Sequence, residues 1–196
     1  MAKRLFDIVF SLLALPILIP FLILISIAVF IGSGSPVFYF QNRVGRNNRE
    51  FGLIKFRTMV AGSDKKGLIT VGKRDNRITQ VGHFLRKYKL DELPQFINVL
   101  LGDMSVVGPR PEVKKYVSLY TEEQLKVLSV RPGLTDPASL EFVNESEILT
   151  KYTDPEKAYI EEIMPKKLEM NLDYIENRSL MGDIKIILKT LGKIIS

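Results

Sequence analysis

The longest apolar stretch of the chain lies close to its N-terminus, where the 24 residues 8–31 carry no charged side chain. A helix of this length can cross the hydrocarbon core of a bilayer. A cleaved signal peptide is the alternative, but its apolar core usually has about 7 to 15 residues and ends at small side chains. Here the stretch ends at GSGSP, residues 32–36, which is typical of an exit turn. We therefore expect a membrane segment that is retained in the mature protein.

Two prolines interrupt this stretch, Pro16 near its middle and Pro20 one helical turn later. Proline bends or breaks a helix because it lacks the backbone donor and clashes with a preceding carbonyl. The arms on either side of Pro16 would be about 18 and 22 Å long, and neither crosses about 30 Å of hydrocarbon. Basic residues flank both ends, which places both on the cytoplasmic side. We predict a re-entrant helix–break–helix over residues 1–34, broken at Pro16, with a kinked spanning helix as the alternative.

Beyond the membrane segment, the pattern predicts a small β-hairpin followed by helices. Short apolar runs at residues 37–40 and 51–56 flank a polar Asn-Asn turn and predict two strands. Over residues 93–101, apolar side chains recur with helical spacing, and Gly102 follows as a C-cap. We expect an α/β fold, mostly helical with a small β-hairpin, in a catalytic domain of residues 35–196. Further helical patterns cover residues 81–89, 112–120, 155–177 and 180–195.

The predicted helix 180–195 is amphipathic. Its apolar side chains share one face, while a lysine recurs every four residues on another. A helix lying in the membrane interface has this pattern, and a helix packed against a protein core explains it equally well. The apolar face consists of Ile184, Ile187, Leu188, Leu191 and Ile195.

Positive charge is concentrated directly after the membrane segment. The chain has a net charge of +6, and residues 35–90 carry 13 basic and three acidic side chains, whereas residues 91–196 carry 13 basic and 18 acidic ones. Such a basic block suits anionic lipid headgroups or a phosphate-rich ligand. Nucleic acid is another common partner, but the chain has no helix-turn-helix, RRM or KH pattern. We expect membrane lipids as a partner and no nucleic acid.

The candidate chemistry centres on two adjacent carboxylates. The chain has no cysteine and one histidine, which excludes thiol catalysis and zinc or iron–sulfur clusters held by cysteine. Asp91 and Glu92 stand at the predicted start of the helix that ends at Gly102, and basic residues precede them. After this helix, Arg110 stands between two prolines that stiffen its backbone. An acidic residue at a helix start is often only a cap, but two carboxylates among cations indicate a metal or phosphate site.

The sequence around this pair closely resembles the core of the bacterial sugar transferase family, the monotopic phosphoglycosyl transferases. The similarity is carried by KLDELPQFINVLLGDMSVVGPRP at residues 89–111. The resemblance covers residues 3–135, and the chain then departs from the loop rich in glutamine and asparagine that many members have, which leaves the sugar undetermined. Matching motifs in the expected order are KRLFD at residues 3–7, QNRVG at 41–45, KFRTM at 55–59 and VRPGLT at 130–135.

The resemblance implies transfer of a phosphosugar from a UDP-sugar to polyprenol phosphate, such as undecaprenyl phosphate, with UMP as the second product. Asp91 would be the nucleophile and form a covalent phosphosugar–aspartyl intermediate. Mg²⁺ would bind Asp91 and the diphosphate, while Glu92 would orient the metal or accept a proton. The residues implied in phosphate and substrate binding are Lys55, Arg86, Pro109, Arg110 and Pro111.

The resemblance also implies a location at the cytoplasmic face of the bacterial inner membrane. Copies of the same chain and glycosyltransferases of the same glycan pathway are further partners to consider. Two other functions stay open, a tethered binding protein without turnover and a hydrolase that releases sugar phosphate without a lipid acceptor. The presence of Asp91, Glu92 and Arg110 favours the transferase.

Overall fold

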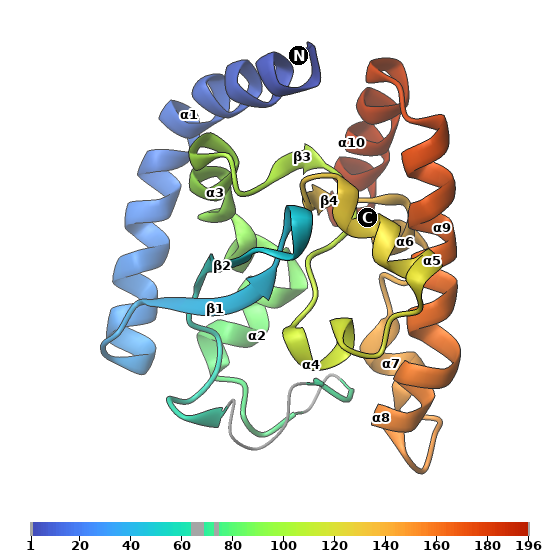
Figure 1. Cartoon of the computed structure of the whole chain (residues 1–196). Helices are drawn as coiled ribbons and strands as arrows, with labels where there is room; N and C mark the ends of the chain where they lie inside the picture. The colour runs from blue at the N-terminus through green and yellow to red at the C-terminus, as the bar shows by residue number, and fades with distance from the viewer. Residues whose placement is uncertain (1, 64–68, 73–74, 196) are drawn as a thin grey trace.

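The computed structural model describes residues 2–63, 69–72 and 75–195. Helix α1 (Ala2–Ser33) runs along the top and down one side of the molecule, and helices α9 (Met164–Asn177) and α10 (Leu180–Ile195) form the opposite side (Figure 1). The strands and the short helices fill the space between these two sides. The prediction of a mostly helical α/β fold with a small β-hairpin is confirmed.

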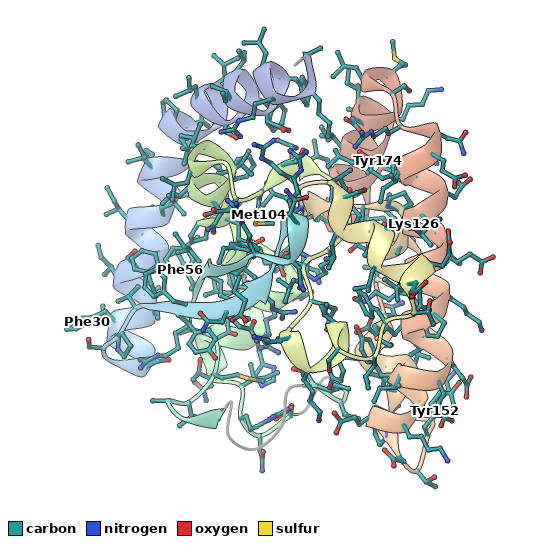
Figure 2. All side chains as sticks on the ribbon, viewed as in Figure 1. Phe30, Phe56, Met104, Lys126, Tyr152 and Tyr174 are labelled. Carbon is teal, nitrogen blue, oxygen red and sulfur yellow. The ribbon has the colours of Figure 1, made fainter. Side chains whose placement is uncertain are left out.

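Helix α1 contains both Pro16 and Pro20 and continues through them. It changes direction about midway along its length, as Figure 1 shows, and missing backbone donors at prolines are a common cause of such bends. The break predicted at Pro16 is therefore a bend within one helix. The helix is long and apolar enough to cross a membrane, and Phe30 near its end points away from the rest of the protein (Figure 2). Its buried residues are Asp7, Ser11 and Val29.

The predicted hairpin is present as strands β1 (Phe38–Val44) and β2 (Glu50–Phe56), which pair antiparallel along their whole length. Between them, Asn47 and Asn48 adopt φ angles of 56° and 59°, a region that asparagine enters more readily than most residues. A second small sheet was not predicted. In it, β3 (Ser105–Val107) pairs in parallel with β4 (Gly133–Thr135), and strands of three residues are too short to show an apolar alternation.

The helix that follows the two carboxylates begins later than predicted. A 3-10 turn, η3 (Leu90–Glu92), and Pro94 come first, so that helix α3 spans only Gln95–Leu101. Gly102 ends it with a φ angle of 96°, as the C-cap prediction requires. Asp91 and Glu92 thus lie in a separate turn ahead of the helix and not in its first α-helical turn.

Several predicted helices are divided into shorter segments. The helix expected over residues 155–177 consists of α8, a π-helical turn η5 and α9, and the one expected over 112–120 is limited to α4. Helix α2 (Gln80–Lys87) lies close to its predicted position. The other helical segments whose bounds the structure describes are η1 (Arg46–Asn48), α4 (Lys114–Val117), α5 (Glu122–Leu125), η4 (Lys126–Ser129), α6 (Pro137–Glu141), α7 (Glu145–Leu149), α8 (Pro155–Ala158) and η5 (Tyr159–Ile163).

In the described part of the chain, the core consists of three hydrophobic clusters. One lies among α4, η4, α7, α8, η5 and α9, and a second, with Met104 and Tyr174 in the interior, joins β2, β3 and α9 (Figure 2). The third joins α1 to β2 and α2 through Val29, Phe56 and Leu85. Because Val29 and Phe56 are fully buried there, α1 is part of the packed core and not a separate tether.

Helix α10 packs with one face and exposes another. Ile186 and Ile187 contact the second cluster, so Ile187 belongs to the packed face. The side chain of Ile195 lies outside the described residues. The core-packed interpretation thus holds for one face, and contact of the other with lipid stays a prediction. The exposed apolar side chains of α10 are Leu180, Met181, Ile184, Leu188 and Leu191.

Both ends of α1 are bound to the same body of protein by arginines. Near its start, Arg4 donates hydrogen bonds to the backbone carbonyls of residues 99–100 in the last turn of α3, at 2.6 and 2.9 Å. At its other end, Arg57 donates to the carbonyls of residues 33–35, where α1 stops. Arg4 thus satisfies the Leu100 carbonyl and adds a donor to the Val99 carbonyl, which also accepts from the Gly102 amide, while Arg57 satisfies carbonyls at and just beyond the end of α1.

Candidate active site

Asp91 is a buried carboxylate with an unsatisfied oxygen. Its residue is only 7% exposed, and its Oδ1 has no hydrogen-bond partner within the described part of the chain. Burial and the neighbouring Glu92 raise the pKa of Asp91, while the positive charges of Arg86, Lys89 and Lys55 oppose the rise. Because a buried polar atom without a partner is costly, such a group is more typical of a functional site than of a structural one.

Glu92, in contrast, is fully engaged. Arg110 donates from both terminal guanidinium nitrogens to the two carboxylate oxygens of Glu92, with 3.1 Å between Nη1 and Oε2. Burial would raise the pKa of Glu92, but the charge and hydrogen bonds of Arg110 outweigh it and lower the pKa to about 2. Pairs of this bidentate kind are strong and restrict geometry. Glu92 therefore stays ionised and holds Arg110 in one orientation.

A rigid loop carries Arg110 to this position. Pro109 and Pro111 are buried on either side of it, and their rings restrict the backbone. The Pro109 carbonyl accepts a hydrogen bond from the Gly133 amide at 3.0 Å, and the Pro111 carbonyl accepts one from Arg43 at 2.9 Å. The two prolines thus shape and anchor the loop, and Arg110 is its charged group.

Lys55 and Arg86 are half-buried cations near Asp91 that form no ion pair with a carboxylate in the described ranges, and the exposed Lys89 forms none there either. Lys55 donates to the side-chain oxygen of Gln41 at 2.9 Å. Arg86 donates to the hydroxyl groups of Thr58 and Thr70, at 2.9 and 3.2 Å. Because these partners are neutral, no carboxylate in the described ranges compensates the charge of either cation directly, which leaves both available to an incoming anion.

The residues implied by the family resemblance come together in the structure. Burial lowers the pKa of Arg86, and it lowers that of Lys55 to about 8, while the negative charge of Asp91 acts on both in the opposite direction. Arg110 contacts the turn η3, which carries Asp91, through its hydrogen bonds to Glu92. The arrangement is a buried carboxylate between two unpaired cations and one ion pair, which suits the binding and displacement of phosphate.

Arg43 is a contributor that the sequence analysis did not assign. It donates to Gln41 at 2.9 Å and forms an ion pair with Glu112 at 3.2 Å. After burial, its charge is the largest influence that lowers the pKa of Lys55. The signal was available, since Arg43 and Gln41 belong to the QNRVG motif, but their proximity to Lys55 depends on the pairing of β1 with β2.

The donor set fits Mg²⁺ only together with a phosphate ligand. Across residues 2–63, 69–72 and 75–195, there is no group of three or more acidic or histidine side chains that could hold a metal ion. Mg²⁺ often binds through one or two carboxylates plus substrate phosphates and water. Asp91 offers an oxygen without a partner, whereas Arg110 occupies both oxygens of Glu92. Asp91 is thus the protein group best placed for the metal.

Comparison with known proteins identifies the family. Residues 1–196 match the family described as Bacterial sugar transferase, and the chain belongs to it. Membership and the long apolar helix α1 together indicate association with a membrane.

Curated relatives resemble the chain over nearly its whole length. A UDP-N-acetylgalactosamine-undecaprenyl-phosphate N-acetylgalactosaminephosphotransferase of Aeromonas hydrophila is 36% identical and covers 99% of this chain, which spans 44% of that protein. The uncharacterized sugar transferase EpsL of Bacillus subtilis is 37% identical over 98% of this chain and 87% of its own length. A UDP-glucose:undecaprenyl-phosphate glucose-1-phosphate transferase of Escherichia coli is 37% identical over 97% of this chain and 39% of its own. The chain thus spans less than half of the first and third of these relatives.

Proposed function

We propose that the protein transfers a phosphosugar from a UDP-sugar to undecaprenyl phosphate or a similar polyprenol phosphate, and releases UMP. The observation that carries this proposal is the unpartnered, buried oxygen of Asp91 beside the cations Lys55 and Arg86. The names of the Aeromonas hydrophila and Escherichia coli relatives, which specify UDP-sugars and undecaprenyl phosphate, support the same reaction. Because those two relatives differ in their sugar, they leave the sugar of this protein undetermined. The product would start a glycan on its lipid carrier.

In the proposed mechanism, a carboxylate oxygen of Asp91 attacks the phosphorus next to the sugar. The bond from this phosphorus to the bridging oxygen breaks, UMP leaves with the electron pair, and the phosphosugar stays bound to Asp91. An oxygen of the lipid phosphate then attacks the same phosphorus, which forms the polyprenol-diphospho-sugar and frees the carboxylate. A covalent intermediate of this kind divides one difficult transfer into two easier displacements.

The surrounding charges would make the attack of one anion on another feasible. Lys55 and Arg86 would neutralise oxygens of the diphosphate, and such preorganised charges act strongly in a buried site. Mg²⁺, held by Asp91 and the diphosphate, would supply further charge neutralisation at the transferred phosphoryl group. With a pKa of about 2, Glu92 is a weak proton acceptor, so we assign it the orientation of Arg110.

The reaction is tested with the full chain in detergent or nanodiscs, undecaprenyl phosphate, Mg²⁺ and a panel of UDP-sugars, with UMP release as the signal. We expect UMP release with at least one UDP-sugar. This release should continue over many turnovers only when the lipid acceptor is present. Release of free sugar phosphate without lipid would instead identify a hydrolase. A folded sample that binds UDP-sugar but never releases UMP would identify a binding protein and refute the transferase.

The arrangement of α1 supports a re-entrant topology at the cytoplasmic face. Arg4 and Arg57 bind the two ends of this helix to the same body of protein, so a spanning helix would have to break one of these contacts. Residues 1–34 would form the membrane segment, and residues 35–196 the catalytic domain on the cytoplasmic face of the inner membrane. Copies of the chain and glycosyltransferases of the pathway stay predicted partners.

Cysteine labelling provides a direct test of topology. Because the native chain has no cysteine, Ala2→Cys and Ser35→Cys each introduce the sole reactive thiol. We expect an impermeant maleimide to label both variants from the cytoplasmic side, as it would label the control Lys126→Cys on the exposed surface. Labelling of Ala2→Cys and Ser35→Cys from opposite sides would establish a spanning helix.

Lys55 should make substrate capture depend on pH. Its pKa of about 8 means that it is charged below pH 8 and loses its charge as the pH rises further. Burial and then the charge of Arg43 lower this pKa most, Arg86 lowers it less, and the charges of Asp91 and Glu92 raise it. We expect kcat/KM for the UDP-sugar to fall above about pH 8 by up to about tenfold per pH unit. Lys55→Arg, which stays charged, should shift the decline to higher pH, and an unchanged profile would exclude Lys55 as its cause.

A further inference from the structure

Glu92 and Arg110 lie on two consecutive segments of the chain, which we call the two legs of the site. The turn η3 and helix α3 form a first leg, which carries Glu92, and strand β3 with its following loop forms a second leg, which carries Arg110. The legs join at residues 102–104. At the opposite, open end, the ion pair between Glu92 and Arg110 connects them. The ion pair therefore connects Arg110 to the first leg, which also carries Asp91.

Helix α1 binds both legs close to their junction. Arg4 donates to the carbonyls of residues 99–100 at the end of the first leg. Asp7 is 2% exposed, and its Oδ1 accepts hydrogen bonds from the Ser105 hydroxyl at 2.9 Å and from the Val106 amide at 3.0 Å, at the start of the second leg. Arg4 and Asp7 are three residues apart on a helix, so they lie on the same face of α1.

The contacts of Arg4 and Asp7 fix the positions of the two legs relative to α1. The guanidinium of Arg4 satisfies the Leu100 carbonyl at the end of α3 and shares the Val99 carbonyl with the Gly102 amide. The buried carboxylate of Asp7 would be costly without donors, and the second leg supplies two. Arg4 also lies so close to the junction that a Cβ atom on Gly102 would come within 3.3 Å of its Nη2. One turn of α1 thus holds the two legs in a defined position relative to each other.

We propose that Arg4 and Asp7 are positioning residues for the phosphoryl transfer. Through the two legs, they align the pair of Glu92 and Arg110 with the nucleophile Asp91, although neither touches the substrate. This inference rests on the proposed function. It makes α1 a structural part of the active site, so that the seating of this helix affects the rate of the chemical step as well as the location of the protein.

The test compares Arg4→Gln and Asp7→Asn with the wild type, as full chains in nanodiscs, by steady-state UMP release at varied UDP-sugar concentration. A misplacement of about 1 Å can cost about 10²-fold in rate, so we expect kcat to fall by that order while KM for the UDP-sugar changes less than about threefold. Arg4→Lys should restore part of the rate, because a lysine can reach a carbonyl but lacks the forked donors. Lys3→Gln is the control from the same turn of α1, since Lys3 pairs with Asp183 of α10 at 2.5 Å and its side chain makes no direct hydrogen bond to either leg among the described residues.

Hydrogen exchange separates this proposal from the proposed function. We expect Arg4→Gln and Asp7→Asn to speed amide exchange in residues 92–101 and 105–110, and Lys3→Gln to leave it unchanged. A wild type that releases no UMP would refute the transferase, while the exchange result would still decide whether α1 holds the legs. If an active wild type and Arg4→Gln share the same kcat and the same exchange, or if Lys3→Gln loses as much, the positioning role is wrong.

Discussion

Asp91→Asn is expected to reduce UMP release by at least about 10³-fold, since the loss of an essential nucleophile costs this much or more. Asparagine has nearly the same volume as aspartate, so it fits the buried turn without opening a cavity. It lacks the negative charge, and its neutral amide cannot form the acyl phosphate of the intermediate. The measurement is UMP release at saturating UDP-sugar and lipid acceptor, together with the intact mass of the denatured protein.

The mass measurement detects the intermediate directly. With UDP-sugar and no lipid acceptor, the wild type should gain the mass of one phosphosugar, and Asp91→Asn should gain nothing. Asp173→Asn removes the same charge from the exposed surface of α9 and should behave as the wild type. If Asp91→Asn still released UMP at the wild-type rate, the aspartyl mechanism would be wrong, even though the transferase reaction could stand.

Glu92→Gln and Arg110→Gln are each expected to lower kcat/KM by about 10²-fold, the order seen when an electrostatic group aimed at the reacting atoms is lost. In Glu92→Gln, Arg110 loses the carboxylate that orients it. In Arg110→Gln, Glu92 adds an uncompensated negative charge beside the nucleophile. Because the two residues act as one unit, the double variant should be at most about tenfold worse than either single variant.

A double-mutant cycle over these four proteins measures this coupling. Glu123 and Lys126 provide the matched control, since they form an exposed ion pair in which both side chains are 63% exposed. Glu123→Gln and Lys126→Gln should leave kcat/KM unchanged, because exposed pairs contribute little. Losses that simply multiply in the Glu92 and Arg110 double variant would show that the two residues act independently.

The predictions that succeeded from the sequence depend on local patterns. Asn47 and Asn48 have positive φ angles in the hairpin turn, and Gly102 ends α3, because these conformations are properties of the residues themselves. The start of α3 was wrong by a few residues because Pro94 imposes a separate turn before the helix. The second sheet was missed because β3 and β4 are short and pair across a long interval of sequence.

The sequence indicated which residues form the site, but it indicated much less about the role of each residue. Asp91, Glu92 and Arg110 stand in one motif, so they could be selected together. Two facts depend on contacts that no local pattern encodes. Both carboxylate oxygens of Glu92 are paired with Arg110, while one carboxylate oxygen of Asp91 has no partner among the described residues.

For the membrane segment too, some features can be predicted from the sequence and others depend on tertiary contacts. The apolar stretch, its prolines and its basic flanks are readable along the chain, because hydrophobicity and backbone donors belong to individual residues. The tertiary structure alone placed Arg4 at the end of α3, Asp7 at the start of β3 and Arg57 at the end of α1. Buried charges need specific partners, and for these residues the partners lie some 20 to 100 positions away in the sequence. Only the folded chain brings them together, and with them the two legs that carry the site.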